Sequence, residues 1–198
     1  MIQLGYRKVI TTPHVMMDFY KNTSDGIIKG LDNIREKVLK QGLTIDIEAA
    51  AEYYCDDFFM EMIKKKDLLT FGDNYVLFEL PFTSEPRMMK DCIFDMQMAG
   101  YKPVLAHPER YSFWYHDFEK YIDLIDRGVK LQLNINSLSG QYPPDTKKMA
   151  EKLVAKGMIS FLGSDCHNMN HIAMTHEAIK EEAIHQVLAS GNLLNNTL

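Results

Sequence analysis

The sequence PVLAHPER at residues 103–110 decides the fold. Its apolar first half is typical of a buried β-strand, and the strand should stop near His107, because the proline that follows cannot donate a hydrogen bond to a neighbouring strand. In proteins built from parallel strands and helices, functional side chains follow the carboxyl ends of strands, since the packed helices cover the other faces. His107, Glu109 and Arg110 are therefore candidates for a site at such an edge.

A second apolar run, at residues 158–162, leads to Asp165 and His167. If the chain stays extended there, alternation directs these two side chains to the same face. A carboxylate and an imidazole on one face are suited to a metal ion.

Three further segments with strand character carry a histidine or a glutamate at or near their ends. Residues 6–12 lead to His14, and residues 43–53 carry Glu52 next to small side chains that leave room for an ion. Glu79 lies in the apolar run at residues 75–81, where an unpaired buried carboxylate would be costly. Taken singly, His14 also fits a structural role and Glu52 a surface role, but their recurrence at strand ends favours a shared site.

Amphipathic helical patterns separate the strands, which gives six strand–helix units in an α/β fold. Ser24, Ser84 and Asp145 are the expected N-caps of three of the helices. The last helical pattern runs to about residue 190, and the polar tail at residues 191–198 is expected to be loose.

Length and composition are typical of one globular domain over residues 1–198, with 46% hydrophobic and 25% charged residues. The net charge of −5 argues against non-specific nucleic-acid binding, which needs clustered cations. Three cysteines without paired spacing indicate neither a disulfide framework nor a thiolate zinc site, which suits a reducing cytoplasm. The sequence has no signal-peptide pattern and no apolar run near the ~20 residues that a membrane span needs.

The candidate ligands are imidazoles and carboxylates, a set that suits Mn²⁺, Fe²⁺ or Zn²⁺. Ligands from five strand ends can hold two or more ions, and a multinuclear centre suits hydrolysis of a phosphate ester. Arg110 has the planar donor geometry that grips a phosphate, although it also has Glu109 beside it as an ion-pair partner. The aromatic residues at 111–115 either wall a substrate pocket or cover the mouth of a barrel.

Five sequence pieces carry a family resemblance: TPH at 12–14, AEYY at 51–54, LFE at 77–79, LAHPERY at 105–111 and GSDCHN at 163–168. Together they resemble the bacterial metal-dependent tyrosine phosphatases of the polymerase-and-histidinol-phosphatase (PHP) superfamily over nearly the whole chain. The resemblance implies a distorted (β/α)7 TIM-like barrel with a manganese-type cluster. It also implies hydrolysis of phosphotyrosine on proteins, with a role in regulating the tyrosine kinase of capsular or exopolysaccharide synthesis.

The same resemblance assigns roles to residues. Arg110 matches a phosphate-binding arginine, with Tyr111 beside it at the substrate. The residues that match metal ligands are His14, Glu52, Glu79, His107, Asp165 and His167.

The sequence departs from the family pattern in two places. The family begins with a strand bearing a His-x-His pair, and this chain has no such segment, so one barrel strand is expected to be missing. The family also has an arginine a few residues after the GSDCHN motif, where His171 is here the candidate to hold phosphate. These departures keep two alternatives open: a phosphatase for small esters such as histidinol phosphate, or an inactive truncated barrel that binds partners, including a second copy, through unpaired strand edges.

Overall fold

The computed structural model describes residues 1–198 as an α/β fold in which all paired strands run parallel. Its contacts group the chain into two compact units, residues 1–79 with 86–103 and residues 80–85 with 104–198. None of the helices has the combination of length and apolar character that would cross a membrane. The expected single domain over the whole chain stays a prediction.

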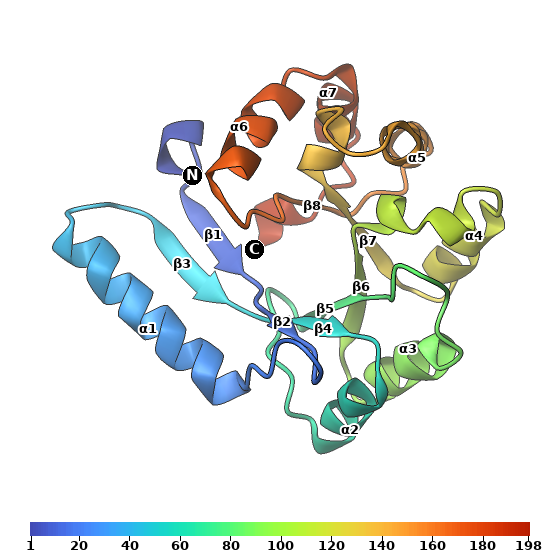
Figure 1. Cartoon of the computed structure of the whole chain (residues 1–198), viewed down its shortest axis with the longest axis horizontal. Coiled ribbons are helices and arrows are strands. Elements are labelled where there is room, and N and C mark those ends of the chain that lie inside the picture. Colours follow the sequence, from blue (N-terminus) through green and yellow to red (C-terminus); the bar gives the residue numbers. More distant parts are fainter. The chain divides into compact units, whose positions relative to one another are not determined.

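The first unit contains two groups of parallel strands: β1 pairs with β3, and β4 lies between β2 and β5. Its elements are the 3-10 helix η1 (Ile2–Leu4), β1 (Lys8–Thr11), β2 (His14–Val15), α1 (Ser24–Lys40), β3 (Asp46–Ala49), β4 (Glu52–Tyr54), α2 (Asp57–Lys65), β5 (Tyr75–Glu79) and α3 (Met89–Met98). Figure 1 shows α1 beside β3 in this unit.

The segment expected to be one strand at residues 43–53 is two short strands, β3 and β4, and β1 is likewise followed by β2. The backbone hydrogen bonds continue across the breaks, since Ala50 N–H donates to Thr11 O and Glu52 N–H donates to Pro13 O. Pro13 has no N–H that could donate to a neighbouring strand, so regular strand pairing is interrupted there. After this interruption, β2 begins at His14 and β4 begins at Glu52.

Two helix starts differ from the sequence expectation. Thr23, not Ser24, caps α1, because its side chain accepts a hydrogen bond from Gly26 N–H at 3.1 Å. The expected cap Ser84 is wrong as well, since α3 begins at Met89 without a side-chain cap.

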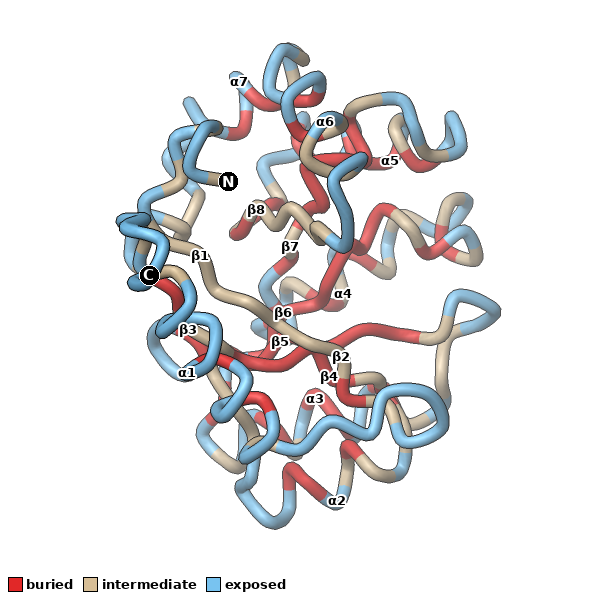
Figure 2. Tube along the Cα trace, turned by 60° about the vertical axis from the view of Figure 1, so that its left-hand side comes forward, coloured by how far each residue is buried: buried red, intermediate tan, exposed pale blue.

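The buried stripe of α1 is narrow for a helix with this many apolar residues. Ile27 and Leu31 are buried, but Ile28 and Ile34 are exposed, and Figure 2 shows most of α1 in the exposed colour. The helix therefore contributes only a small part of its apolar surface to the core of its unit.

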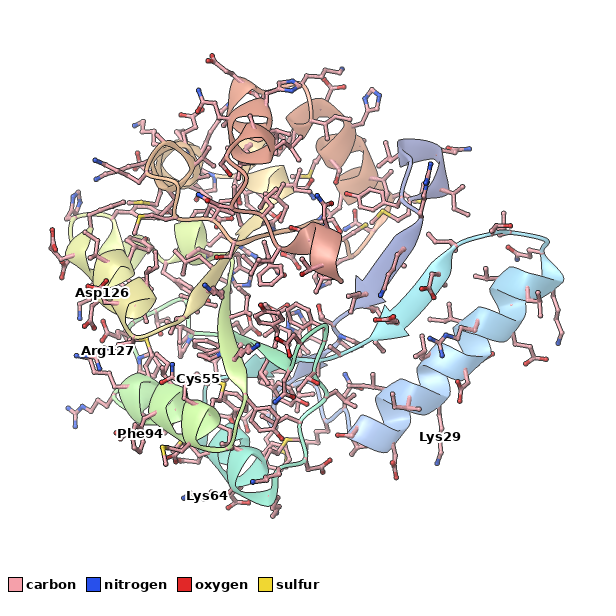
Figure 3. The ribbon with its side chains drawn as sticks, turned by 180° about the vertical axis from the view of Figure 1, so that it is seen from behind. Lys29, Cys55, Lys64, Phe94, Asp126 and Arg127 are labelled. Atoms are coloured by element: carbon pink, nitrogen blue, oxygen red, sulfur yellow. The ribbon has the colours of Figure 1, made fainter.

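The cysteines of the first unit are free thiols, in line with the sequence expectation. Cys55, labelled in Figure 3, has its Sγ 3.4 Å from Sγ of Cys92, far beyond the ~2.05 Å of a disulfide bond. The hydrogen bond to Cys92 and burial both raise the pKa of Cys55, so this thiol stays protonated, and both buried cysteines act as core packing.

The second unit has three adjacent parallel strands in the order β6, β7, β8. Its elements are β6 (Lys102–Ala106, in this unit from Val104 on), the 3-10 helices η2 (Pro108–Arg110) and η3 (Ser112–Trp114), α4 (Glu119–Asp126), β7 (Lys130–Asn134), η4 (Ile135–Leu138), α5 (Pro144–Ala155), β8 (Phe161–Gly163), α6 (Met169–Ala178), α7 (Glu182–Ala189) and η5 (Asn195–Thr197).

Two expectations for the helices of this unit were wrong. Helix α5 begins at Pro144, so Asp145 lies inside the first turn and is not the cap. The last helical pattern is two helices, α6 and α7.

The tail is not loose. The side chain of Asn195 accepts a hydrogen bond from Leu162 N–H at 2.9 Å and donates one to Leu162 O at 3.0 Å, and Leu194 N–H donates to Ser160 O. The tail thereby satisfies backbone groups along β8, the last strand in the order, which would otherwise need other partners.

Candidate metal and phosphate site

The first unit brings His14, Glu52 and Glu79 together. Each lies at an end of one of three adjacent strands, because β2 and β4 begin at His14 and Glu52, which are register partners, and β5 ends at Glu79. The possible ligand atoms of the three side chains all lie within 4.8 Å of one another. His14 Nδ1 is 3.1 Å from Glu79 Oε1. This triad was predicted from the sequence, although His14 begins a strand instead of following one and Glu52 begins a strand instead of ending one.

The triad fits a divalent ion by its burial and its chemistry. Glu52 and Glu79 expose only 5% and 6% of their surface, and two carboxylates this close and this buried repel each other unless a cation or a proton intervenes. One imidazole and two carboxylates are donors that Mn²⁺, Fe²⁺ or Zn²⁺ accept.

Neighbouring groups hold the triad in place. The backbone N–H of Cys55 donates to Glu79 O at 2.9 Å, and the side chain of Asn22 donates to His14 O at 2.8 Å. The ring of Tyr20 lies against the ring of His14, with centroids 5.2 Å apart. Such support around a ligand fixes its orientation.

In the second unit, His107 follows β6 as the sequence predicts. It is buried and has a left-handed backbone, with φ of 35°, at the turn into η2. A non-glycine residue in this region is strained, and such strain is found mostly at functional sites, where the surroundings enforce it.

Glu109 does not pair with Arg110, contrary to one alternative from the sequence. Its Oε1 accepts hydrogen bonds from Asn134 N–H at 3.1 Å and from the Ser137 hydroxyl at 2.6 Å. Burial raises the pKa of Glu109, and the hydrogen bond from Ser137 and the neighbouring His107 act in the opposite direction. This carboxyl group therefore braces the turn after β6 against β7.

Arg110 pairs with Asp165 instead. Its Nη1 donates to Asp165 Oδ2 at 3.1 Å, and the side chain of Asn134 donates to the same oxygen at 3.1 Å. The arginine is thus fixed beside one of the expected metal ligands, in a geometry that sequence spacing alone does not reveal.

Asp165 and His167 lie together, but not for the expected reason. The strand β8 ends at Gly163, and Asp165 has a left-handed backbone with φ of 46°, so the segment is a turn and not an extended chain. Within this turn His167 Nδ1 is 3.3 Å from Asp165 Oδ1. His171 joins them, because it lies in the first turn of α6, which Asn168 caps, with its Nδ1 3.0 Å from Asp165 O.

Tyr111 packs inside the second unit, and its expected substrate contact stays a prediction. Its side chain is fully buried, and its hydroxyl accepts from Leu80 N–H at 2.9 Å and donates to Ala106 O at 3.1 Å. Trp114 is also buried, with its Nε1 donating to Glu85. For these two aromatic residues, the structure favours packing over the walls of a substrate pocket.

Sequence reasoning missed Phe82 and Tyr142, whose rings lie 4.8 Å and 5.2 Å from the guanidinium carbon of Arg110. Neither lies at a strand end or in a recognised motif, so no sequence signal singled them out. A common centre that joins His14, Glu52 and Glu79 to the ligand candidates of the second unit stays a prediction.

Parallel strands that carry a half-buried histidine and two buried glutamates define an α/β protein with a candidate divalent-metal centre. The comparisons with known proteins give the family. Residues 2–188 match the family described as capsular polysaccharide synthesis, CpsB/CapC, and the chain belongs to this family.

Among its relatives, the chain is 29% identical over 169 residues to tyrosine-protein phosphatase YwqE of Bacillus subtilis, covering 85% of this chain and 66% of that protein. It is 24% identical to putative tyrosine-protein phosphatase CapC of Staphylococcus aureus, covering 82% of this chain and 64% of the relative. With CpsB of Streptococcus pneumoniae the identity is 26%, over 84% of this chain and 71% of the relative. The chain thus spans just under two thirds of the length of the first two relatives.

A solved structure is similar as well. It comes from work on YwqE of Bacillus subtilis and CpsB of Streptococcus pneumoniae, described as unique metal-dependent tyrosine phosphatases. The TM-score is 0.83 at 26% sequence identity, over 96% of this chain and 79% of the other.

Proposed function

We propose that this protein is a metal-dependent phosphatase that hydrolyses phosphotyrosine on proteins and acts in capsular or exopolysaccharide synthesis. The observation that carries the proposal is the triad of His14 and the buried Glu52 and Glu79, with ligand atoms no more than 4.8 Å apart. Membership of the CpsB/CapC family and the names of the relatives support the substrate class.

The finer parts of the proposal follow the same relatives. We expect a (β/α)7-type barrel, two or more ions of the manganese, iron or zinc type, a bacterial tyrosine kinase as the phosphorylated partner, and a cytoplasmic location. His107, Asp165 and His167 complete the proposed ligand set.

The residues have distinct roles in the proposed reaction. A bound divalent ion supplies a water of lowered pKa and positive charge opposite the phosphoryl oxygens. His14, Glu52 and Glu79 hold that ion.

In the second unit, Arg110 donates hydrogen bonds to the phosphate, and Asp165, itself held by Asn134, keeps the guanidinium in place. We assign His171, which bonds to the backbone of Asp165, to the phosphate as well.

The test is hydrolysis of a phosphotyrosyl peptide by protein freed of metal with a chelator and then given Mn²⁺. We expect no turnover before Mn²⁺ and turnover after it, with little activity restored in Glu52→Gln. Glu36→Gln, an exposed carboxylate on α1, is the matched control and should behave as the unaltered protein. A protein that stays inactive with Mn²⁺ contradicts the proposal, and a higher rate on histidinol phosphate than on the peptide points to a small-molecule phosphatase.

A further inference from the structure

The guanidinium of Arg110 lies against two aromatic rings. Its central carbon is 4.8 Å from the ring centroid of Phe82 and 5.2 Å from that of Tyr142. Arginine stacks favourably on aromatic faces, so each contact restrains the guanidinium. The ion pair with Asp165 adds a third restraint on the same group.

These restraints determine how Arg110 can bind a ligand. The N–H donors of a guanidinium point outward in its plane, so rings packed against the group leave its edge as the route for an oxygen atom. One edge position is taken by Asp165, through Nη1. A phosphate that binds Arg110 must therefore approach in the plane of the guanidinium, at a donor that Asp165 leaves available.

Phe82 also touches the neighbouring candidate ligand. Its ring stacks on the ring of His107, with centroids 5.6 Å apart and an interplanar angle of 24°, and it lies 5.9 Å from the ring of Tyr111. Tyr111 is buried, whereas Phe82 keeps 46% of its surface exposed. An exposed aromatic face thus borders both His107 and Arg110, the residues assigned to metal and phosphate.

We propose that Phe82 is a specificity-determining residue that selects aryl over alkyl phosphate esters, and that Tyr142 is a positioning residue for Arg110. This inference rests on the proposed function, because it takes Arg110 as the phosphate-binding group. A phenyl ring attached to the bound phosphate gains an aromatic contact with Phe82 that a short alkyl group does not make equally well. Aromatic pairs contribute about 0.5–1.5 kcal/mol, which corresponds to roughly two- to tenfold in affinity.

The experiment measures binding and not turnover. Isothermal titration calorimetry with the full chain and Mn²⁺ compares two non-hydrolysable probes, phenylphosphonate and propylphosphonate. We expect the unaltered protein to prefer phenylphosphonate by about three- to tenfold. The preference should fall to near one in Phe82→Leu and return in Phe82→Tyr.

Two further variants separate specificity from positioning. Tyr142→Leu should weaken both probes by a similar factor, about two- to fivefold, and leave their ratio intact. Phe94→Leu is the matched control, since Phe94 on α3, labelled in Figure 3, is an exposed phenylalanine and should leave both affinities unchanged. Circular dichroism verifies that each variant folds, and Phe82→Met replaces Phe82→Leu if the latter does not.

Equal binding of the two probes by the unaltered protein overturns the inference. An unchanged ratio in folded Phe82→Leu overturns it as well, and so does full affinity in Tyr142→Leu for the positioning role. A failure of the proposed function is distinct: the protein would then show the expected probe preference and its loss in Phe82→Leu, yet would not hydrolyse a phosphotyrosyl peptide.

Discussion

Replacing Glu79 by glutamine should change stability in opposite directions with and without metal. Without metal, the carboxylates of Glu52 and Glu79 have atoms no more than 4.8 Å apart and are nearly buried. At an effective dielectric constant of about 20, two such charges repel by about 3.5 kcal/mol, part of which the His14 imidazole offsets, with its Nδ1 3.1 Å from Glu79 Oε1. Glu79→Gln should therefore raise the unfolding free energy of the metal-free protein by about 1–3 kcal/mol.

With saturating Mn²⁺ the sign reverses. Mn²⁺ present at 1,000 times its dissociation constant stabilises by about 4.1 kcal/mol, and a variant that lacks one charged ligand loses most of this, which is more than it gained without metal. For a chain of this size each kcal/mol corresponds to about 2–4 °C in the unfolding temperature. Glu79→Gln should thus unfold several degrees above the unaltered protein in chelator and below it in Mn²⁺.

The assay is thermal unfolding followed by circular dichroism at pH 8, in chelator and in a Mn²⁺ series. Glu36→Gln, an exposed substitution on α1, is the control and should follow the unaltered protein within about 0.5 kcal/mol under both conditions. If Mn²⁺ does not raise the unfolding temperature of the unaltered protein, or if Glu79→Gln destabilises equally in both conditions, the metal assignment is refuted.

Three other predictions concern the second unit. Arg110→Lys keeps the charge but loses the planar donor edge, so the KM for a phosphotyrosyl peptide should rise about tenfold or more, and an unaltered KM would contradict the assigned role. Asn195→Ala leaves the N–H and C=O of Leu162 without their side-chain partner, and should lower the unfolding free energy in urea by about 1–3 kcal/mol. Burial raises the pKa of Tyr121 above its ordinary value of 10.0. Above pH 10 the phenol therefore ionises in the unfolded chain before it ionises in the folded one, so the stability that it contributes is complete below pH 10 and declines as the pH rises further. Tyr121→Phe should therefore be less stable than the unaltered protein at pH 8, through loss of its hydrogen bond to Pro108, and this deficit should shrink by up to about 1.4 kcal/mol per pH unit above pH 10; a constant deficit argues against the shift.

The order of strands and helices was largely readable from the sequence, because apolar runs and helical periodicity report burial directly. The meeting of His14, Glu52 and Glu79 was predicted as well, but from the carboxyl ends of strands, whereas only Glu79 lies at such an end and the other two residues begin their strands. Free cysteines were predicted because the chain has three cysteines without paired spacing, and the structure confirms them.

The remaining features depend on contacts between residues far apart along the chain. The interruptions before β2 and β4 arise where two paired segments meet. The cap of α1 is Thr23, one residue before Ser24, which as a possible cap could not be told apart from it by residue type. The tail was expected to be loose because its residues are polar. The side chain of Asn195 nevertheless bonds to the N–H and the C=O of Leu162 in β8, as a neighbouring strand would.

The surroundings of Arg110 illustrate the same limit. Glu109 is its sequence neighbour, but the partner in space is Asp165, 55 positions away in the sequence. Phe82 and Tyr142 carry no motif, and only their distance from the guanidinium reveals them.

The central claim is that His14, Glu52 and Glu79 bind a divalent ion, and anomalous diffraction from crystals of the protein grown with Mn²⁺ tests it most directly. The account predicts an anomalous peak within about 2.0–2.3 Å of the imidazole of His14 and the carboxylates of Glu52 and Glu79. A map with no peak beside these three side chains, from crystals in which Mn²⁺ saturates the protein in solution, would contradict it.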